Sequence, residues 1–190
     1  GERLADGTFS KGARNPWLMP LVKLAIETAM RRGELLSLSW ENVDLVRQTA
    51  HLPNTKNGDR RTVPLSTRAV AILKALPTPR AEEDLEGEKE ALRSGVVFPT
   101  TALALRKGFA RAIERAQEQY RADCKQAKRR PVPGFLEDVH FHDTRHEAAS
   151  RLAEKLTNVL ELSAVTGHRD LRMLKRYYHP RAEDLAKKLG

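Results

Sequence analysis

The stretch TAMRRGELLSLSWENVDLVRQTAHLPNTKNGDRRTVPL, residues 28–65, changes its hydrophobic pattern midway, and this change indicates the fold class. Its first part, up to Trp40, has the apolar spacing of a helix. The segments 43–53 and 60–65 are instead short and rich in residues that favour strands. Between them lies Asn57-Gly58, a pair that tolerates positive φ angles and is typical of a hairpin turn. The stretch therefore predicts a β-hairpin within the chain.

Outside this hairpin the chain is predicted to be mostly helical. Asn15 and Pro16 suit the start of a first helix, and Ser66 suits the cap of a short helix after the hairpin. A longer helix is expected from Thr101 to about Lys128. Further helical stretches are expected at 142–156, 158–166, 170–178 and 181–189. The predicted fold class is thus mainly α with a small antiparallel β-sheet (α+β).

Composition narrows the class of protein. The 190 residues hold 34 Lys and Arg against 25 Asp and Glu, and this net charge of +9 favours a polyanionic partner. Hydrophobic residues make up 40% of the chain, which is enough for a packed core. No stretch approaches the ~18 consecutive apolar residues that a membrane helix needs, and no segment resembles a signal peptide. A lone Cys124 excludes an intramolecular disulfide and a metal site built from cysteines. Secreted, membrane and zinc-finger classes are therefore excluded.

The domain organisation is expected to be simple. Residues 1–14 are polar, contain glycine and lack an apolar period, so we expect a linker remnant from a missing N-terminal domain. Residues 15–190 are expected to form one domain with a tail helix at about 181–189. Residues 82–90 hold six acidic side chains and are expected to form a solvated loop. The chain is thus expected to be part of a longer cytoplasmic protein.

Two pairs of residues with a spacing of three could bind an anion. His142 and Arg145 share one face of a predicted helix, and an imidazole beside a guanidinium can grip two oxygens of a phosphate. Arg31 and Glu34 have the same spacing, so the carboxylate can brace the guanidinium. Arg32 competes with Arg31 for this role. Each pair taken alone is more often an ordinary pair on the surface of a helix.

The segment TGHRDLRMLKRYYHP, residues 166–180, contains candidates for nucleophilic chemistry. Its glycine can end a helix, which leaves His168 at the corner before the next one. Tyr177 and Tyr178 follow among cationic residues, which would stabilise a phenolate. Lys56, at the tip of the predicted hairpin, could swing into a groove and protonate a leaving alkoxide. Taken alone, tyrosines in a helix are usually half-buried packing residues, and a lysine at a turn usually only increases solubility.

Taken together, these residues resemble the tyrosine recombinase (phage integrase) family in type, order and spacing. That family has a helix-borne arginine followed by Glu, a hairpin lysine, HxxR, Gly-His and a tyrosine near the C-terminus. The matching residues here are Arg31, Lys56, His142, Arg145, His168 and Tyr177. The strings MRRGELLSLSWENVDL, TKNGDRRTVPL and GHRDLRMLKRYYHP also look like motif blocks of the family. The resemblance favours Arg31 over Arg32 and Tyr177 over Tyr178, and it shows one departure, Ala29, where the family commonly has Gly.

The resemblance implies the catalytic-domain fold of that family (the DNA breaking-rejoining type) and a site-specific recombination reaction on double-stranded DNA. Tyr177 would attack a phosphodiester, which gives a covalent 3′-phosphotyrosine and a free 5′-hydroxyl. Arg31 and Arg145 would stabilise the negative charge of the phosphorane, and His168 would donate a further hydrogen bond. The reaction would need no metal and no cofactor, and the sequence shows no acidic cluster of the sort that holds Mg²⁺.

Three further roles follow from the same resemblance. His142 would assist proton movement at the nucleophile, and Lys56 would protonate the 5′-oxygen as general acid. Glu34 would orient Arg31 from behind. Two other proteins would share the fold: a DNA-binding domain that no longer cuts, and a relaxing enzyme that resembles type IB topoisomerases.

The basic residues between 101 and 130 are candidates for contacts with the DNA backbone, although a basic helix can equally be only a solvated face. There are nine Lys and Arg in this segment against three acidic residues. The candidates are Arg106, Lys107, Arg111, Arg115, Lys125, Lys128, Arg129 and Arg130. The resemblance further implies a homotetramer on DNA for the full-length protein, and an origin in a prokaryotic cell, a phage or another mobile genetic element, with roles in DNA integration.

Overall fold

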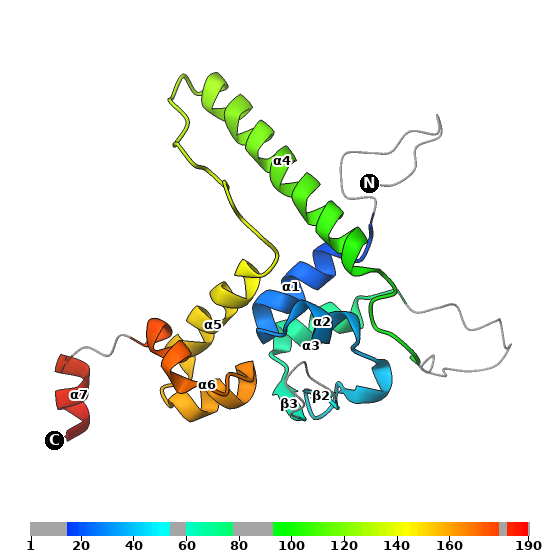
Figure 1. The fold of residues 1–190 in the computed structure, drawn as a ribbon, viewed down its shortest axis with the longest axis vertical. Helices are drawn as coiled ribbons and strands as arrows, with labels where there is room; N and C mark the ends of the chain where they lie inside the picture. The colour runs from blue at the N-terminus through cyan, green and yellow to red at the C-terminus, as the bar shows by residue number, and fades with distance from the viewer. Residues whose placement is uncertain (1–14, 54–59, 78–92, 179–181, 190) are drawn as a thin grey trace, which may run out of the picture.

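A computed structural model of the chain describes residues 15–53, 60–77, 93–178 and 182–189, and Figure 1 shows its ribbon. Helices dominate, and a three-stranded antiparallel sheet lies among the first of them, which confirms the predicted fold class. The α-helices are α1 (Leu18–Thr28), α2 (Arg32–Leu36), α3 (Thr67–Lys74), α4 (Ala102–Gln126), α5 (Asp143–Lys155), α6 (Val159–Thr166) and α7 (Ala182–Leu189). The other described elements are the 3₁₀ helices η1 (Trp40–Asn42) and η2 (Leu171–Tyr177), and the strands β1 (Val43–Asp44), β2 (Thr49–Leu52) and β3 (Arg61–Pro64).

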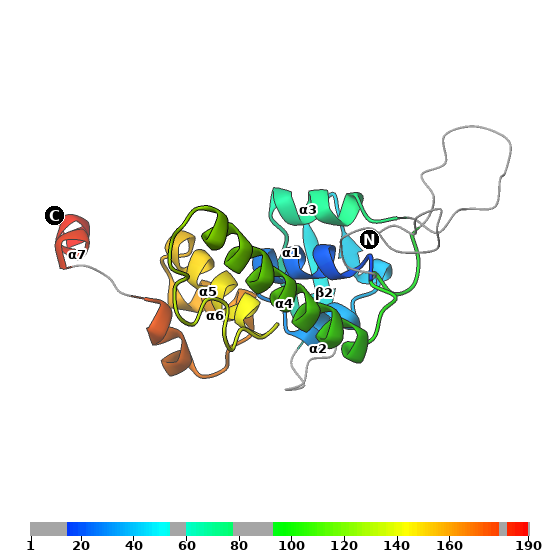
Figure 2. The same cartoon turned by 90° about the horizontal axis from the view of Figure 1, so that it is seen from above.

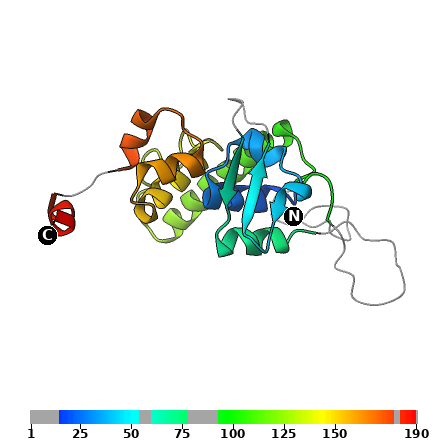
Figure 3. The ribbon, with the colours of Figure 1, turned by 90° about the horizontal axis from the view of Figure 1, so that it is seen from below.

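The sheet has the strand order β1-β2-β3 and turns one face toward the core (Figure 3). Ala50 on β2 pairs with Val63 on β3, and both side chains are fully buried. Because side chains alternate along a strand, Arg61 lies on the same inward face as Val63. The predicted turn at Asn57-Gly58, with Lys56 beside it, lies outside the described residues.

A single main core joins the sheet to α1 and α3, and the C-terminal part of the chain docks against it. Leu21 and Leu24 of α1 and Leu73 of α3 are fully buried in this core. Helix α5 packs on α1, and α6 packs on β3. In Figures 1 and 2, α5, α6 and η2 therefore gather on one side of α1, while the sheet and α3 lie on the other. This docking brings residues that are more than 100 positions apart into contact.

The chain after α2 differs from the sequence-based expectation. The apolar spacing up to Trp40 predicts a continuing helix, but α2 ends at Leu36. The Leu38 carbonyl instead accepts the Val97 N–H at 2.8 Å, and the Trp40 N–H donates to the Gly95 carbonyl at 2.9 Å. This segment is therefore extended, because backbone groups from a distant part of the chain replace its helical hydrogen bonds.

Helix α4 extends away from the rest of the fold, as Figure 1 shows, and follows the predicted range closely. Thr101 caps its start by accepting the Ala104 N–H at 3.1 Å. Near the C-terminal end of α4, the Tyr120 ring stacks on the Phe135 ring with 3.8 Å between centroids. The segment after α4 therefore folds back along the helix. In the part of the chain that the structure describes, no helix is both long and apolar enough to cross a bilayer.

Candidate active site

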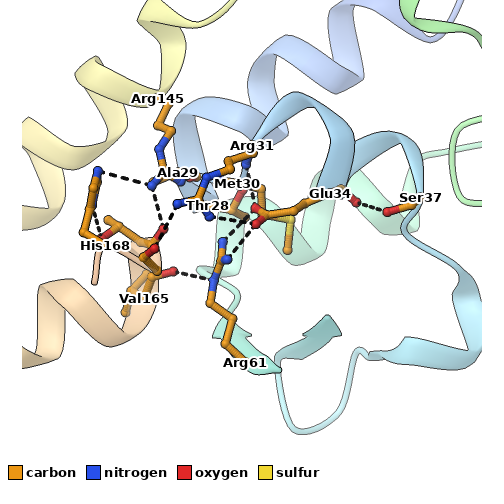
Figure 4. A network of polar contacts seen from close by, with 12 residues as sticks. Thr28, Ala29, Met30, Arg31, Glu34, Ser37, Arg61, Arg145, Val165 and His168 are labelled. Carbon is orange, nitrogen blue, oxygen red and sulfur yellow. Dashed lines mark hydrogen bonds and ion pairs between the residues drawn. The ribbon is translucent and has the colours of Figure 1, made fainter. Parts of the chain in front are cut away.

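Four segments that are distant in the sequence meet beside the C-terminal end of α6 (Figure 4). They are the junction of α1 and α2, strand β3, the start of α5, and the corner between α6 and η2. Each segment contributes a polar side chain whose partners come from the other segments. Within the described ranges, no three His, Cys, Asp or Glu side chains are grouped so that they could hold a metal ion.

Glu34 lies at the centre of this site and holds two guanidinium groups. Its side chain is only 4% exposed, and it accepts the backbone N–H of Arg31 at 2.7 Å and Arg31 Nη1 at 3.0 Å. Nη1 and Nη2 of Arg61 donate to its two oxygens at 2.7 and 2.8 Å. Burial alone would raise the pKa of Glu34, but hydrogen bonds from Arg61 and Arg31 outweigh it and hold the pKa below its usual value. Glu34 is therefore ionised at neutral pH and orients both arginines.

The end of α6 presents three successive backbone carbonyls, and each accepts a hydrogen bond from a different arginine. The pairs are Arg61 Nε with Val165 at 3.3 Å, Arg145 Nη2 with Thr166 at 2.7 Å, and Arg31 Nη2 with Gly167 at 2.9 Å. Carbonyls at a helix C-terminus lack partners within the helix, and the helix dipole favours cations there. The end of α6 therefore fixes three cations in one place.

Arg145 is the most enclosed of these cations. It is 4% exposed, and besides Thr166 it donates to the backbone carbonyl of Ala29 at the end of α1. Ala29 has a φ of 53° and a ψ of 20°, a left-handed conformation that glycine adopts more readily, so the departure seen in the sequence keeps a backbone suited to Gly. Burial, followed by repulsion from Arg31, lowers the pKa of Arg145 to about 10. Arg145 is therefore still charged at neutral pH.

His168 lies next to Arg145 and is neutral at neutral pH. Burial, followed by the charges of Arg145 and Arg31, lowers its pKa to about 4. Its Nδ1 lies 2.7 Å from Oγ1 of Thr166, whose hydroxyl donates to the Leu162 carbonyl at 2.7 Å. Thr166 Oγ1 therefore accepts from Nδ1–H, and Nε2 is left to accept from Arg145 Nη2 at 3.3 Å. The site thus sets both the charge and the tautomer of this imidazole.

The two neighbouring tyrosines have different surroundings. Residues 170–178, predicted to be helical, form the 3₁₀ helix η2 with Tyr177 at its end and Tyr178 just after it. Oη of Tyr177 lies 2.6 Å from Nδ1 of His146, and burial raises the pKa of this phenol although Arg176 and Arg145 act against the rise. The Tyr178 hydroxyl instead donates to the backbone carbonyl of Leu156 at 2.5 Å. Tyr177 is therefore the phenol that faces the charged cluster.

Of the remaining predicted site residues, His142 is described by the structure and Lys56 is not. His142 is exposed at the start of α5, and its ring meets His146 edge-on with 5.2 Å between centroids. Lys56 lies outside the described residues. Sequence reasoning left out two residues of the cluster, Arg61 and His146. Strand alternation places Arg61 on the same face as buried Val63, which could have indicated that Arg61 points inward. His146 lies four residues after His142, which could have indicated that both share one face of the helix.

The basic residues proposed to contact DNA all lie on α4 or in the turn after it, and all are exposed. Two of them contact neighbouring parts of this segment: Arg115 Nε donates to the Arg111 carbonyl at 3.3 Å, and the Arg129 guanidinium lies 5.6 Å from the centre of the Tyr120 ring. The structure thus separates them from the arginine cluster around Glu34.

Comparison with solved structures places this arrangement on a known fold. The catalytic domain of bacteriophage HP1 integrase matches with a TM-score of 0.54 and 23% identity over 94% of this chain and 83% of that chain. The Tn1549 transposon integrase in complex with circular intermediate DNA matches with a TM-score of 0.60 and 17% identity over 98% of this chain and 67% of that chain. At this level of identity the likeness shows the fold.

Curated proteins with similar sequences give a second comparison. The shufflon-specific DNA recombinase of Escherichia coli is 43% identical over 93% of this chain and 38% of its own length. A putative integrase/recombinase of Haemophilus influenzae is 36% identical over 87% of this chain and 44% of its own length, so the chain spans less than half of these relatives. The model of the phage integrase family matches residues 7–184, which include all four segments that build the site. Because this match runs through nearly the whole sequence, the chain belongs to the phage integrase family.

Proposed function

We propose that the chain carries the catalytic centre of a site-specific DNA recombinase. In this reaction Oη of Tyr177 attacks a phosphodiester of double-stranded DNA and forms a covalent 3′-phosphotyrosine with a free 5′-hydroxyl. The energy of the broken bond stays in the phosphotyrosyl link, so a 5′-hydroxyl from the same or another strand can reverse the step. Family membership supports this proposal, as do relatives whose names describe recombinases and integrases.

The observation that carries the proposal is the charge beside Tyr177. Arg31, Arg61 and Arg145 against the single carboxylate of Glu34 leave a charge of 3 − 1 = +2 in the cluster, and His168 adds none at neutral pH. A phosphodiester carries one negative charge, and its phosphorane transition state carries about two. Cations fixed in advance stabilise that added charge without having to reorganise. The cluster therefore suits the transition state better than the substrate.

The arginines divide into those that can meet a phosphate and those that hold the others. Arg31 is 24% exposed, so its guanidinium can offer N–H groups to a phosphate while Glu34 and the Gly167 carbonyl hold it. Arg145 is deeper and presents its charge toward Tyr177. Arg61, whose side chain is 9% exposed, serves to position Glu34. We propose that Arg31 and Arg145 bind the scissile phosphate.

The proposed reaction also needs groups that donate and accept protons. A phosphate beside His168 would oppose the positive charges that lower the pKa of this imidazole, so binding would favour a proton on Nε2 and a hydrogen bond to the phosphate. Lys56 remains our candidate for the general acid that protonates the 5′-oxygen, and His142 our candidate for assisting proton movement near the nucleophile. Both roles rest on the family resemblance.

The DNA duplex would extend beyond the scissile phosphate. The exposed basic residues of α4 and the following turn are proposed to contact its backbone, which would give affinity and salt dependence but little sequence information. We also propose that the full-length protein works as a tetramer on DNA, because exchange of strands between two duplexes needs two cleavages on each.

A trapping experiment tests the proposal. Sheared DNA from the organism that encodes the chain is nicked at random, so that a short strand diffuses away after cleavage near a nick and religation fails. The wild-type chain should become linked to DNA in a form that survives denaturant, and peptide mapping should find the adduct on Tyr177. Tyr178→Phe should keep the adduct and Tyr177→Phe should lose it. Absence of any adduct, or its survival in Tyr177→Phe, contradicts the proposal. A duplex recovered from this adduct then provides a defined substrate for cleavage assays.

A further inference from the structure

His146 lies in the site, but the family motif HxxR, which names His142 and Arg145, assigns it no role. It follows Arg145 directly on α5 and is half-buried. Its Nδ1 lies 2.6 Å from Oη of Tyr177, and the two rings are 6.3 Å apart between centroids with an interplanar angle of 34°. This separation is within the reach that a general base needs, about 2.6–3.2 Å between heavy atoms. With its own proton on Nε2, His146 accepts the Tyr177 O–H.

The phenol needs such a partner because the site does not ionise it. Burial raises the pKa of Tyr177 above its usual value of 10.0, and the charges of Arg176 and Arg145 reduce this rise without reversing it. At neutral pH the nucleophile is therefore a protonated phenol, which is a weak nucleophile until its proton is removed. A proton acceptor in contact with Oη would thus raise the rate of attack.

The competing candidate, His142, is less well placed for this step. It is exposed at the start of α5 and meets His146 edge-on, with 5.2 Å between ring centroids. Burial, followed by the neighbouring charges of His146 and Arg145, lowers the pKa of His142, which makes it a weaker base. His146, in contrast, lies within hydrogen-bonding distance of Oη of Tyr177.

We propose that His146 is the general base that removes the proton from Tyr177 during cleavage. This inference rests on the recombinase function proposed above. As the bond between Oη and phosphorus forms, the phenolic proton moves to Nδ1 of His146, which becomes an imidazolium. The bond between phosphorus and the 5′-oxygen breaks, its electron pair leaves with that oxygen, and the oxygen takes a proton from the general acid. In religation the 5′-hydroxyl attacks and returns its proton to the deprotonated general acid, and the departing phenolate recovers its proton from His146.

The test compares three histidine variants in single-turnover cleavage of the trapped duplex. His146→Asn keeps a hydrogen-bonding atom near the position of Nδ1 but cannot take up a proton, and we expect cleavage to slow about 100- to 10,000-fold. His142→Asn should slow cleavage at least tenfold less. The matched control is His140→Asn, at an exposed position before α5, and it should stay within about twofold of wild type. Thermal unfolding and duplex binding show that each variant is folded.

A second measurement separates proton removal from a merely structural role. Groups that face the pair are His142 and Arg145 on α5, His168 at the end of α6, and Arg176 on η2. In His146→Asn, hydroxide must deprotonate the phenol, so the cleavage rate should rise about tenfold per pH unit between about pH 7 and 9, below the pKa of Arg145, whereas the wild-type rate should rise less steeply. A structural defect would lower the rate equally at every pH.

A sulfur substitution shows on which side of the phosphorus His146 acts. When sulfur replaces the bridging 5′-oxygen, the leaving thiolate needs no protonation, so a defect in the general acid disappears. The defect of His146→Asn should persist on this substrate. If the sulfur substrate erases it, or if His146→Asn cleaves within threefold of wild type, the inference is wrong while the recombinase proposal stands. If the wild-type chain forms no adduct, the recombinase proposal itself fails. His146→Gln serves as the second variant if His146→Asn does not fold.

Discussion

Replacement of Gly167 by alanine should destabilise the chain through a collision with Arg61. Gly167 ends α6 with a φ of 68°, and a Cβ built there would lie 2.6 Å from Nη1 and 2.9 Å from Cζ of Arg61. The guanidinium has little freedom to retreat, because Nη1 and Nη2 donate to Glu34 and Nε donates to the Val165 carbonyl. Gly167→Ala must therefore displace Arg61 or shift the end of α6.

The expected cost has two parts. A left-handed backbone costs an alanine about 1–2 kcal/mol, and the smaller entropy of the unfolded chain returns about 0.4–1 kcal/mol, so this part is about 1 kcal/mol. Loss of hydrogen bonds to the charged Glu34 adds about 1.5–3 kcal/mol. Gly167→Ala should thus lower the free energy of unfolding by about 2–4 kcal/mol. Gly95 is the matched control, because it has a φ of 75° and a Cβ added there would meet no atom within 4 Å, so Gly95→Ala should cost only about 1 kcal/mol.

Urea unfolding of the two variants, compared at equal m-values, measures this difference. A double variant adds a sharper check: in an Arg61→Ala background the collision is absent, so Gly167→Ala should cost no more than Gly95→Ala does. Equal losses for Gly167→Ala and Gly95→Ala in the otherwise wild-type chain would refute the reasoning. The same result would indicate that Arg61 moves without loss, and that its contacts with Glu34 stabilise the fold little.

Three further predictions concern His168, Tyr178 and the basic residues of α4. The pKa of His168 is about 4 in the fold against 6.5 in the unfolded chain, so the unfolded chain binds the proton first as the pH falls. The free energy of unfolding, measured by urea titration, should therefore drop between pH 6.5 and pH 4. The drop should be smaller in His168→Gln. A drop of the same size in both would contradict this assignment. Tyr178→Phe loses a hydrogen bond to a backbone carbonyl, so thermal unfolding should show a loss of about 1 kcal/mol while the DNA adduct still forms. Replacement of Lys107 and Lys125 by Gln should reduce the slope of log affinity against log salt by about 2 in duplex titrations, whereas an unchanged slope would exclude both from the DNA contact.

Local patterns in the sequence predicted most elements of the fold. The capped start of α4, the strands around the hairpin and the break before η2 all follow from residues within a few positions of one another. The end of α2 could not be predicted in this way, because its extended continuation depends on backbone groups near Val97. The same limit applies to the partners of Arg61: strand alternation can indicate that Arg61 faces inward, but Glu34 and Val165 lie 27 and 104 residues away. The family motif indicated Arg31, Arg145 and His168 but neither Arg61 nor His146, and most contacts that hold the cluster together are long-range.

The charged cluster raises the question of why cations that repel one another stay together. Their repulsion is visible in the pKa of Arg145, which Arg31 and Arg61 lower in addition to the effect of burial. Glu34 offsets only part of it, because its one carboxylate pairs with two of the three guanidinium groups. The rest of the compensation comes from the end of α6, where successive carbonyls accept from each arginine and the helix dipole favours positive charge.

This arrangement has a mechanical consequence for the proposed reaction. The three arginines come from the start of α2, β3 and α5, yet all of them are positioned by one helix end that leads directly into η2 and Tyr177. A displacement of α6 would therefore remove one hydrogen-bond acceptor from each arginine and would also shift the segment that leads to Tyr177. Removal of α6 from its place against β3 would also leave the arginines with uncompensated repulsion. The charge balance of the proposed site therefore depends on the packing of this short helix against β3.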